Sequence, residues 1–201
     1  MFRMEASGFH GREPDEGRWD LDSGKIDSWA TRLTVNPGRN WSMQYSIGQL
    51  HSPEALAPTE DLRRMTASVM YNRSFRNGNW ASTLAWGRNQ SLSDGNVGNG
   101  YLAESTVQFL SRNRAWTRLE NVDRTTELLE AEHAPTAEFQ ERYFTRVQAY
   151  TLGYDREFGN WPHLSTALGG QMTLYGVPDV LKAEYGSHPA TFTMFLRLRV
   201  K

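Results

Sequence analysis

Histidine and serine are the side chains that could carry acid–base or nucleophilic catalysis here, since the 201-residue chain contains no cysteine. No histidine stands near a second one at a metal-binding spacing, so the sequence predicts no metal centre. Four of the five fall in segments expected to be long loops, where a histidine is usually a polar surface residue. The five positions are His10, His51, His133, His163 and His188.

Two places in the chain put serine directly beside histidine, namely His51-Ser52 and Ser187-His188. A serine nucleophile needs a histidine base within hydrogen-bonding reach, as in the hydrolases found at the outer rim of some membrane barrels. Neighbours in sequence rarely point at each other, so these pairs do not predict such an arrangement. We therefore predict that the protein is not an enzyme and uses no cofactor.

One acidic stretch, which holds Asp15, Glu16, Asp20 and Asp22, could supply oxygen ligands for a hard cation such as Ca²⁺. The spacing of an EF-hand loop is absent. A solvated acidic loop is the prediction for this stretch.

Composition restricts the class of protein. The chain is 38% hydrophobic with a mean hydropathy of −0.65, and it has no run of ~20 predominantly apolar residues, which a membrane-spanning helix needs. A transmembrane β-barrel is compatible with these values, because its wall alternates apolar and polar residues. The net charge of −1 gives no basic excess that would indicate a nucleic-acid partner.

Strict alternation of apolar and polar residues dominates the chain and predicts β-strands. In residues 40–49, for example, Trp41, Met43, Tyr45 and Ile47 alternate with polar or small residues. Ten segments follow this pattern, although its phase is ambiguous in residues 143–154. Long and short connections alternate between them, at 10–26, 36–39, 51–63, 75–78, 89–99, 111–113, 122–141, 157–161 and 175–188.

This alternation of connection lengths is typical of outer-membrane barrels, which have short turns at one rim and long loops at the other. The sequence therefore predicts an all-β fold, an up-and-down antiparallel transmembrane β-barrel of about ten strands. Residues 1–201 form one domain in this prediction. The opening Met1-Phe2-Arg3-Met4-Glu5 lacks the apolar core of a signal peptide.

The polar face of the predicted strands carries long charged side chains of both signs, which suits a hydrated lumen. Rings of arginine favour anions in pores. Alternatively, arginine and glutamate on neighbouring strands pair across the lumen and fill it. The candidate lumen residues are Arg32, Arg64, Glu104, Arg114, Arg118, Glu120, Arg146, Arg197 and Arg199.

Aromatic residues cluster near the ends of the apolar runs, where outer-membrane barrels carry their aromatic girdles. Residues 101–109 span roughly 26 Å as a strand and project to about 20 Å at a tilt of ~40°, which is close to the ~25 Å apolar band. The candidate girdle residues are Trp41, Tyr71, Trp80, Trp86, Tyr101 and Phe109.

Five motifs resemble an uncharacterised family of longer bacterial proteins that are thought to be outer-membrane β-barrels. They are residues 11–16 (GREPDE), 52–56 (SPEAL), 85–89 (AWGRN), 149–154 (AYTLGY) and 175–179 (YGVPD). The resemblance covers essentially the whole chain and matches the C-terminal portion of that family. It implies a porin-like barrel whose N-terminal strands precede this chain, and it implies no chemistry.

Three functions follow as hypotheses. The first is a barrel in the bacterial outer membrane, with the lipid bilayer as partner, that lets small polar or anionic solutes diffuse passively. The second is a plugged structural or adhesive barrel whose loops bind. The third is a soluble lipocalin-like carrier, in which the apolar face would point inward. The solute and the oligomeric state do not follow from the sequence.

Overall fold

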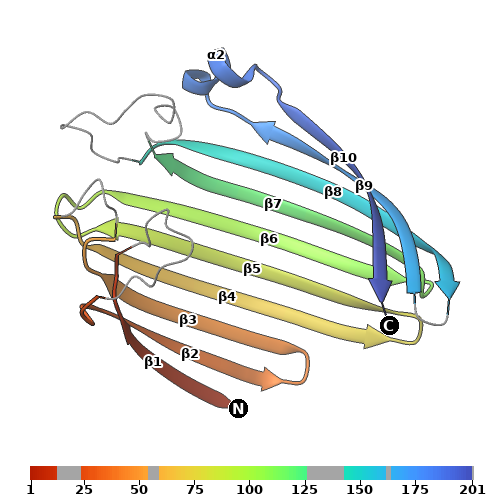
Figure 1. The fold of residues 1–201 in the computed structure, drawn as a ribbon, viewed down its shortest axis with the longest axis horizontal. Helices are drawn as coiled ribbons and strands as arrows, with labels where there is room; N and C mark the ends of the chain where they lie inside the picture. Colours follow the sequence, from red (N-terminus) through yellow and green to blue (C-terminus); the bar gives the residue numbers. More distant parts are fainter. Residues whose placement is uncertain (13–23, 54–58, 126–142, 162–163, 201) are drawn as a thin grey trace.

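The segments in which apolar and polar residues alternate form a single ten-stranded antiparallel sheet in the computed structural model of the protein (Figure 1). The structure describes all residues except 13–23, 54–58, 126–142, 162–163 and 201. The strands are β1 (Phe2–Phe9), β2 (Ser28–Gly38), β3 (Trp41–Leu50), β4 (Leu62–Phe75), β5 (Gly78–Ser91), β6 (Val97–Phe109), β7 (Asn113–Thr125), β8 (Tyr143–Trp161), β9 (Leu164–Gly176) and β10 (Ala190–Val200).

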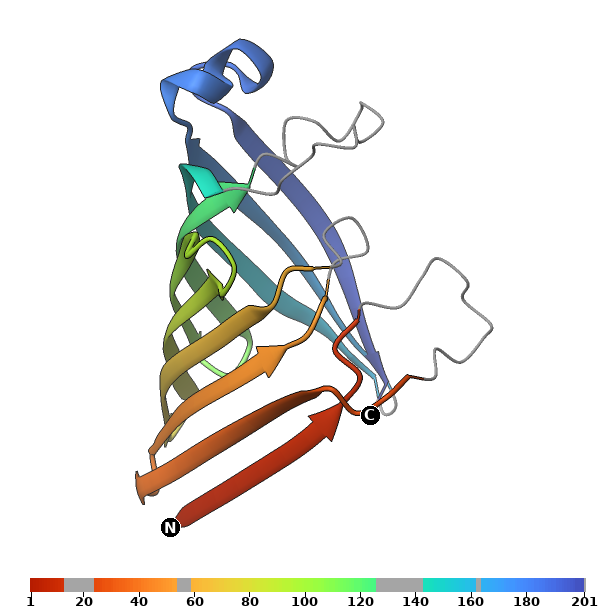
Figure 2. The ribbon, with the colours of Figure 1, turned by 90° about the vertical axis from the view of Figure 1, so that its left-hand side faces the viewer.

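Each strand pairs with its neighbours in the sequence, so the sheet runs from β1 to β10 without a crossover. This confirms the predicted all-β, up-and-down antiparallel fold. The sheet curls strongly but does not close, and β1 and β10 form its two edges in the described part of the chain (Figure 2).

Connection lengths also alternate as predicted. Two or three residues separate β2 from β3, β4 from β5, β6 from β7 and β8 from β9, and these strand ends lie at one rim (Figure 1). The strand ends that are further apart in sequence lie at the opposite rim (Figure 1). The predicted connections differ from the structure by several residues in places, and two of them differ most. The loop expected at 89–99 shrinks to 92–96, because Asn89 and Gln90 pair with Gly98 and Val97.

Residues 157–161 do not form the predicted turn. This segment belongs to β8, which continues to Trp161. A bulge between Glu157 and Gly159 absorbs one extra residue while the ladder with β9 continues. The bulge breaks the alternation that sequence analysis relies on.

A short helical segment caps the link between β9 and β10. It consists of η1 (Asp179–Leu181) and α2 (Lys182–Tyr185) and buries Leu181. Lys182 Nζ donates to Asp179 Oδ1 over 2.6 Å, and this bond lowers the pKa of the Asp179 carboxyl. Within the described residues, no helix has the length and apolar character to cross a membrane.

Large apolar side chains lie mostly on the surface. Ala167 and Leu181 are the only hydrophobic residues buried among those the structure describes. By contrast, Leu84, Leu152 and Phe192 are 61%, 68% and 69% exposed. Strand register places these three residues on one face of the sheet, together with the apolar residues of the other strands.

The opposite face is polar and concave, and we call it the trough. Side chains on strands that are not neighbours meet across it, which requires inward curvature. Trp116 on β7 and Phe195 on β10 have ring centroids 6.0 Å apart. Arg197 on β10 likewise reaches Asp155 on β8, past the intervening β9.

Candidate functional site

A buried carboxylate organises the charges of the trough. Asp155 is only 2% exposed and accepts two hydrogen bonds from Arg197, of 2.9 and 3.0 Å. Arg114 approaches the same carboxylate to 3.9 Å from β7. The two arginines therefore share one negative charge, and a two-pronged guanidinium–carboxylate contact fixes the Arg197 side chain.

Two glycines provide the space for the large trough side chains. A Cβ on Gly153 would lie 2.1–2.4 Å from the indole of Trp116, so the ring rests directly on the β8 backbone. A Cβ on Gly169 would come within 2.5 Å of Phe195 and 2.6 Å of Asp155. Glycine at these positions lets side chains lie over the strand where another residue would stand.

Gly153→Ala is expected to destabilise the protein by about 1–3 kcal/mol, because the new methyl group overlaps the Trp116 ring. Denaturant unfolding gives the free energy, and the environment of Trp116 is read from the change in tryptophan fluorescence. Gly87→Ala is the matched control, since nothing lies within 4 Å of a Cβ there. Equal stability of the two variants would contradict this packing.

A second group of charges lies further along the trough. Arg118 donates to Glu120 over 2.9 Å and approaches Glu104 to 3.7 Å. A hollow of about 400 Å³ opens beside these three side chains. Its lining comes from β6, β7, β8 and β9 and comprises Glu104, Thr106, Trp116, Thr117, Arg118, Glu120, Ala149, Thr151, Gln171, Thr173 and Tyr175.

Strand register places eight of the nine candidate lumen residues on the trough face. They are not one ring. Arg32 lies beside Glu5 and Ser46 near the β1 edge, Arg64 beside Gly48 and Asn89, and Arg199 beside Ser165 near the β10 edge. The structure brings together two groups from the prediction, which are Arg114 with Arg197 and Glu104 with Arg118 and Glu120.

Arg146 lies on the other face, so its predicted place among the lumen residues is wrong. Its guanidinium donates to both oxygens of Asp123, over 2.6 and 3.1 Å, and lies 5.9 Å from the ring centroid of Tyr101. The phase of this segment is ambiguous in the sequence. The register of β8 on β7 places Arg146 opposite Asp123, on the apolar face.

Three important trough residues were missed by the sequence analysis. Asp155 follows the segment of ambiguous phase, and Phe195 and Gln171 carry no charge that would attract notice. Only the tertiary structure shows that Trp116 meets Phe195 and donates from its indole nitrogen to Gln171 over 3.3 Å, across strands that do not pair with β7.

All six candidate girdle residues lie on the apolar face. Three form a cluster near the short-turn rim, where the ring of Tyr71 lies 4.7 Å from that of Trp41 and 5.2 Å from that of Trp80. Trp86 and Tyr101 pair across β5 and β6 nearer the other rim, and Phe109 ends β6. Aromatic residues thus stand at two levels of the apolar face.

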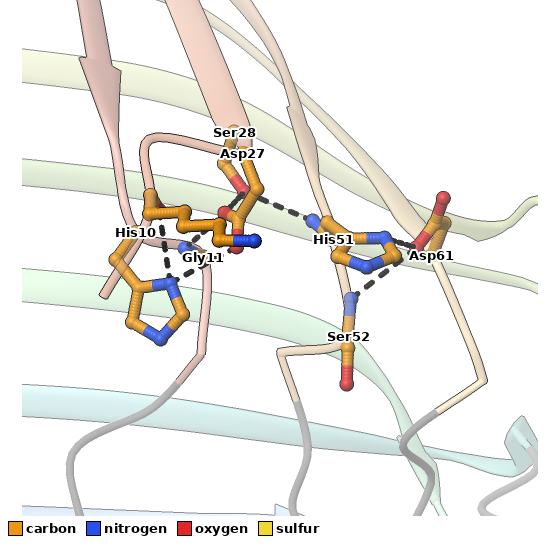
Figure 3. Close-up of polar contacts among 8 residues, drawn as sticks. His10, Gly11, Asp27, Ser28, His51, Ser52 and Asp61 are labelled. Atoms are coloured by element: carbon orange, nitrogen blue, oxygen red, sulfur yellow. Dashed lines mark hydrogen bonds and ion pairs between the residues drawn. The ribbon is translucent and has the colours of Figure 1, made fainter.

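His51 and Ser52, which are neighbours in the sequence, belong to a hydrogen-bonded cluster at the long-loop rim (Figure 3). His51 Nδ1 lies 2.7 Å from Asp61 Oδ1, which also accepts the backbone N–H of Ser52. The His51 backbone N–H in turn donates to Ser28 Oγ, over 3.0 Å. In the described part of the chain, neither serine hydroxyl approaches the His51 imidazole in a hydrogen bond.

Asp27 is the centre of the other half of this rim cluster. It accepts hydrogen bonds from the Gly11 N–H and the Ser28 hydroxyl, both of 2.8 Å, and pairs with His10 Nδ1 at 3.0 Å. The Gly11 N–H, followed by the Ser28 hydroxyl, lowers the pKa of the Asp27 carboxyl. These contacts tie together the rim ends of β1, β2, β3 and β4 (Figure 3).

Comparisons with known proteins identify no relative. No family model matches the chain, and no curated protein or solved structure matches it either. No group of three or more histidine, aspartate or glutamate side chains that could hold a metal ion occurs among the described residues. The acidic stretch of residues 15–22 lies outside them.

Proposed function

We propose that the chain forms the wall of a bacterial outer-membrane β-barrel, through whose hydrated interior small polar solutes diffuse passively. One observation carries the proposal: every strand places large apolar side chains on the outward face, while the inward face holds most of the charged side chains and paired charges. Burying such an outer face in lipid is favourable, whereas exposing it to water is costly.

The soluble lipocalin-like alternative requires the reverse arrangement. A carrier of that class encloses an apolar interior, but here the trough contains Asp155, Arg197 and Arg114 in contact. In lipid, backbone groups at the edges of β1 and β10 also need partners, so the proposal expects both edges to be paired in the membrane.

Pairing of charges limits the preference for anions. Asp155 neutralises part of the charge of Arg114 and Arg197, and two glutamates flank Arg118. We therefore favour uncharged polar solutes over anions. The plugged barrel stays a second candidate, because Trp116 and Phe195 meet across the trough and occupy part of it.

Reconstitution into phospholipid vesicles tests the proposal. Vesicles containing the protein are expected to swell in iso-osmotic arabinose faster than protein-free vesicles, and more slowly in the larger raffinose. Folded protein inserted in the bilayer without any swelling would instead support the plugged barrel. A monodisperse, folded monomer in buffer without detergent would overturn both membrane functions.

A further inference from the structure

One hollow on the trough face combines an aromatic ring with side chains that donate and accept hydrogen bonds. We propose that the 400 Å³ hollow beside Trp116 binds a neutral polyhydroxylated solute, a mono- or disaccharide. In the proposed function, this hollow is a selective binding site on the diffusion path through the barrel. Ligand pockets begin at about 300 Å³, so a hollow of this size suits one or two sugar rings.

Trp116 supplies an apolar platform in a mostly polar wall. Its indole rests on Gly153, and its nitrogen donates to Gln171, so the ring is held in place before any ligand arrives. It also lines the hollow. The C–H groups of a sugar ring present a flat apolar surface, and a fixed aromatic ring is the side chain that complements such a surface at low entropic cost.

The surrounding polar groups match hydroxyl groups, each of which both donates and accepts. Glu104 and Glu120 provide acceptors, and Arg118 between them provides donors. On the next two strands, the hydroxyls of Thr151 and Thr173 lie 2.8 Å apart and are both able to donate and accept. Donors and acceptors therefore line the same hollow as the aromatic ring.

The charges that line the hollow disfavour anions and cations as its ligands. The three ionised side chains of the hollow, Glu104, Arg118 and Glu120, sum to −1, so an anion would meet net repulsion. A cation would have to compete with Arg118, whose guanidinium lies between both carboxylates. A neutral ligand that hydrogen-bonds to Glu104, Arg118 and Glu120 meets neither this repulsion nor this competition.

Isothermal titration of the folded protein with maltose tests the inference. Saturable binding is expected in the millimolar range for wild type. Trp116→Ala is expected to weaken it about tenfold or more, and Trp116→Phe, which keeps an aromatic ring, about threefold or less. Trp29→Ala is the matched control and leaves maltose binding unchanged, because Trp29 lies on the apolar face.

A second variant keeps the test independent of the folding of Trp116→Ala. Glu104→Gln with Glu120→Gln removes both carboxylates but keeps the side-chain shapes, and it is expected to weaken maltose binding about tenfold. Absence of saturable maltose binding by wild type would overturn the inference. Binding of phosphate or choline in preference to maltose would overturn it as well.

The inference rests on the proposed function, but the two fail separately. Maltose binding by folded protein that does not make vesicles permeable would leave the site standing and refute the pore. Vesicle swelling together with no maltose binding would keep the pore and refute the site.

Discussion

Leu84→Arg is expected to destabilise the protein folded in lipid vesicles by about 2–4 kcal/mol, the cost of a cationic side chain near the middle of a barrel's lipid face. Leu84 lies halfway along β5, 61% exposed, between Val69 and Ala103 on the neighbouring strands. In water the same substitution at so exposed a position would change stability by no more than about 0.5 kcal/mol. Urea unfolding from vesicles measures the difference.

Ala85→Arg is the control for this prediction, because Ala85 is the next residue at the same depth but faces the trough beside Ser68 and Leu102. A charge there stays in contact with water and is expected to cost less than about 1 kcal/mol. Equal free energies of unfolding for the two variants would show that the apolar face does not lie in lipid.

Asp155→Asn is expected to cost about 2–3 kcal/mol of stability, because it leaves Arg114 and Arg197 facing each other without the carboxylate between them. Breaking a fully buried ion pair costs about 3–5 kcal/mol. Both arginine side chains here are about a quarter exposed, at 24% and 26%, so water replaces part of the lost interaction and lowers the expected value.

Denaturant unfolding measures this loss, and Glu5→Gln supplies the comparison. Glu5 bonds to Arg3 at 2.7 Å, but the two side chains are 39% and 68% exposed, so its loss is expected to cost less than about 1 kcal/mol. Adding Arg197→Gln to Asp155→Asn should recover part of the stability, because it removes one unpaired charge. A double variant less stable than Asp155→Asn would contradict the shared-charge arrangement.

Much of the fold could be predicted because it depends on local signals. Alternation with a period of two identifies a strand from its own residues, and the order of long and short links fixes an up-and-down arrangement. The failures occur where alternation is broken. The bulge at Glu157–Gly159 concealed the last part of β8, and residues 143–154 gave no clear phase.

The candidate site was predictable only in part, as Arg146 and Asp155 show. Both lie on β8 and both carry charge, yet one pairs with Asp123 on the apolar face and the other binds Arg197 in the trough. A one-residue change of phase exchanges the faces of a strand, so an uncertain phase makes the location of every charge on that strand uncertain.

The sequence by itself determined that the chain forms ten alternating strands, with large apolar residues on one face and most of the charges on the other. The tertiary structure alone decided which side chains of distant strands meet. Trp116 and Phe195 are 79 positions apart and come together because Gly153 and Gly169 leave room above β8 and β9. Such contacts depend on the curvature of the sheet and on the register of three successive strand pairs. No pattern within one strand of the sequence specifies either of these.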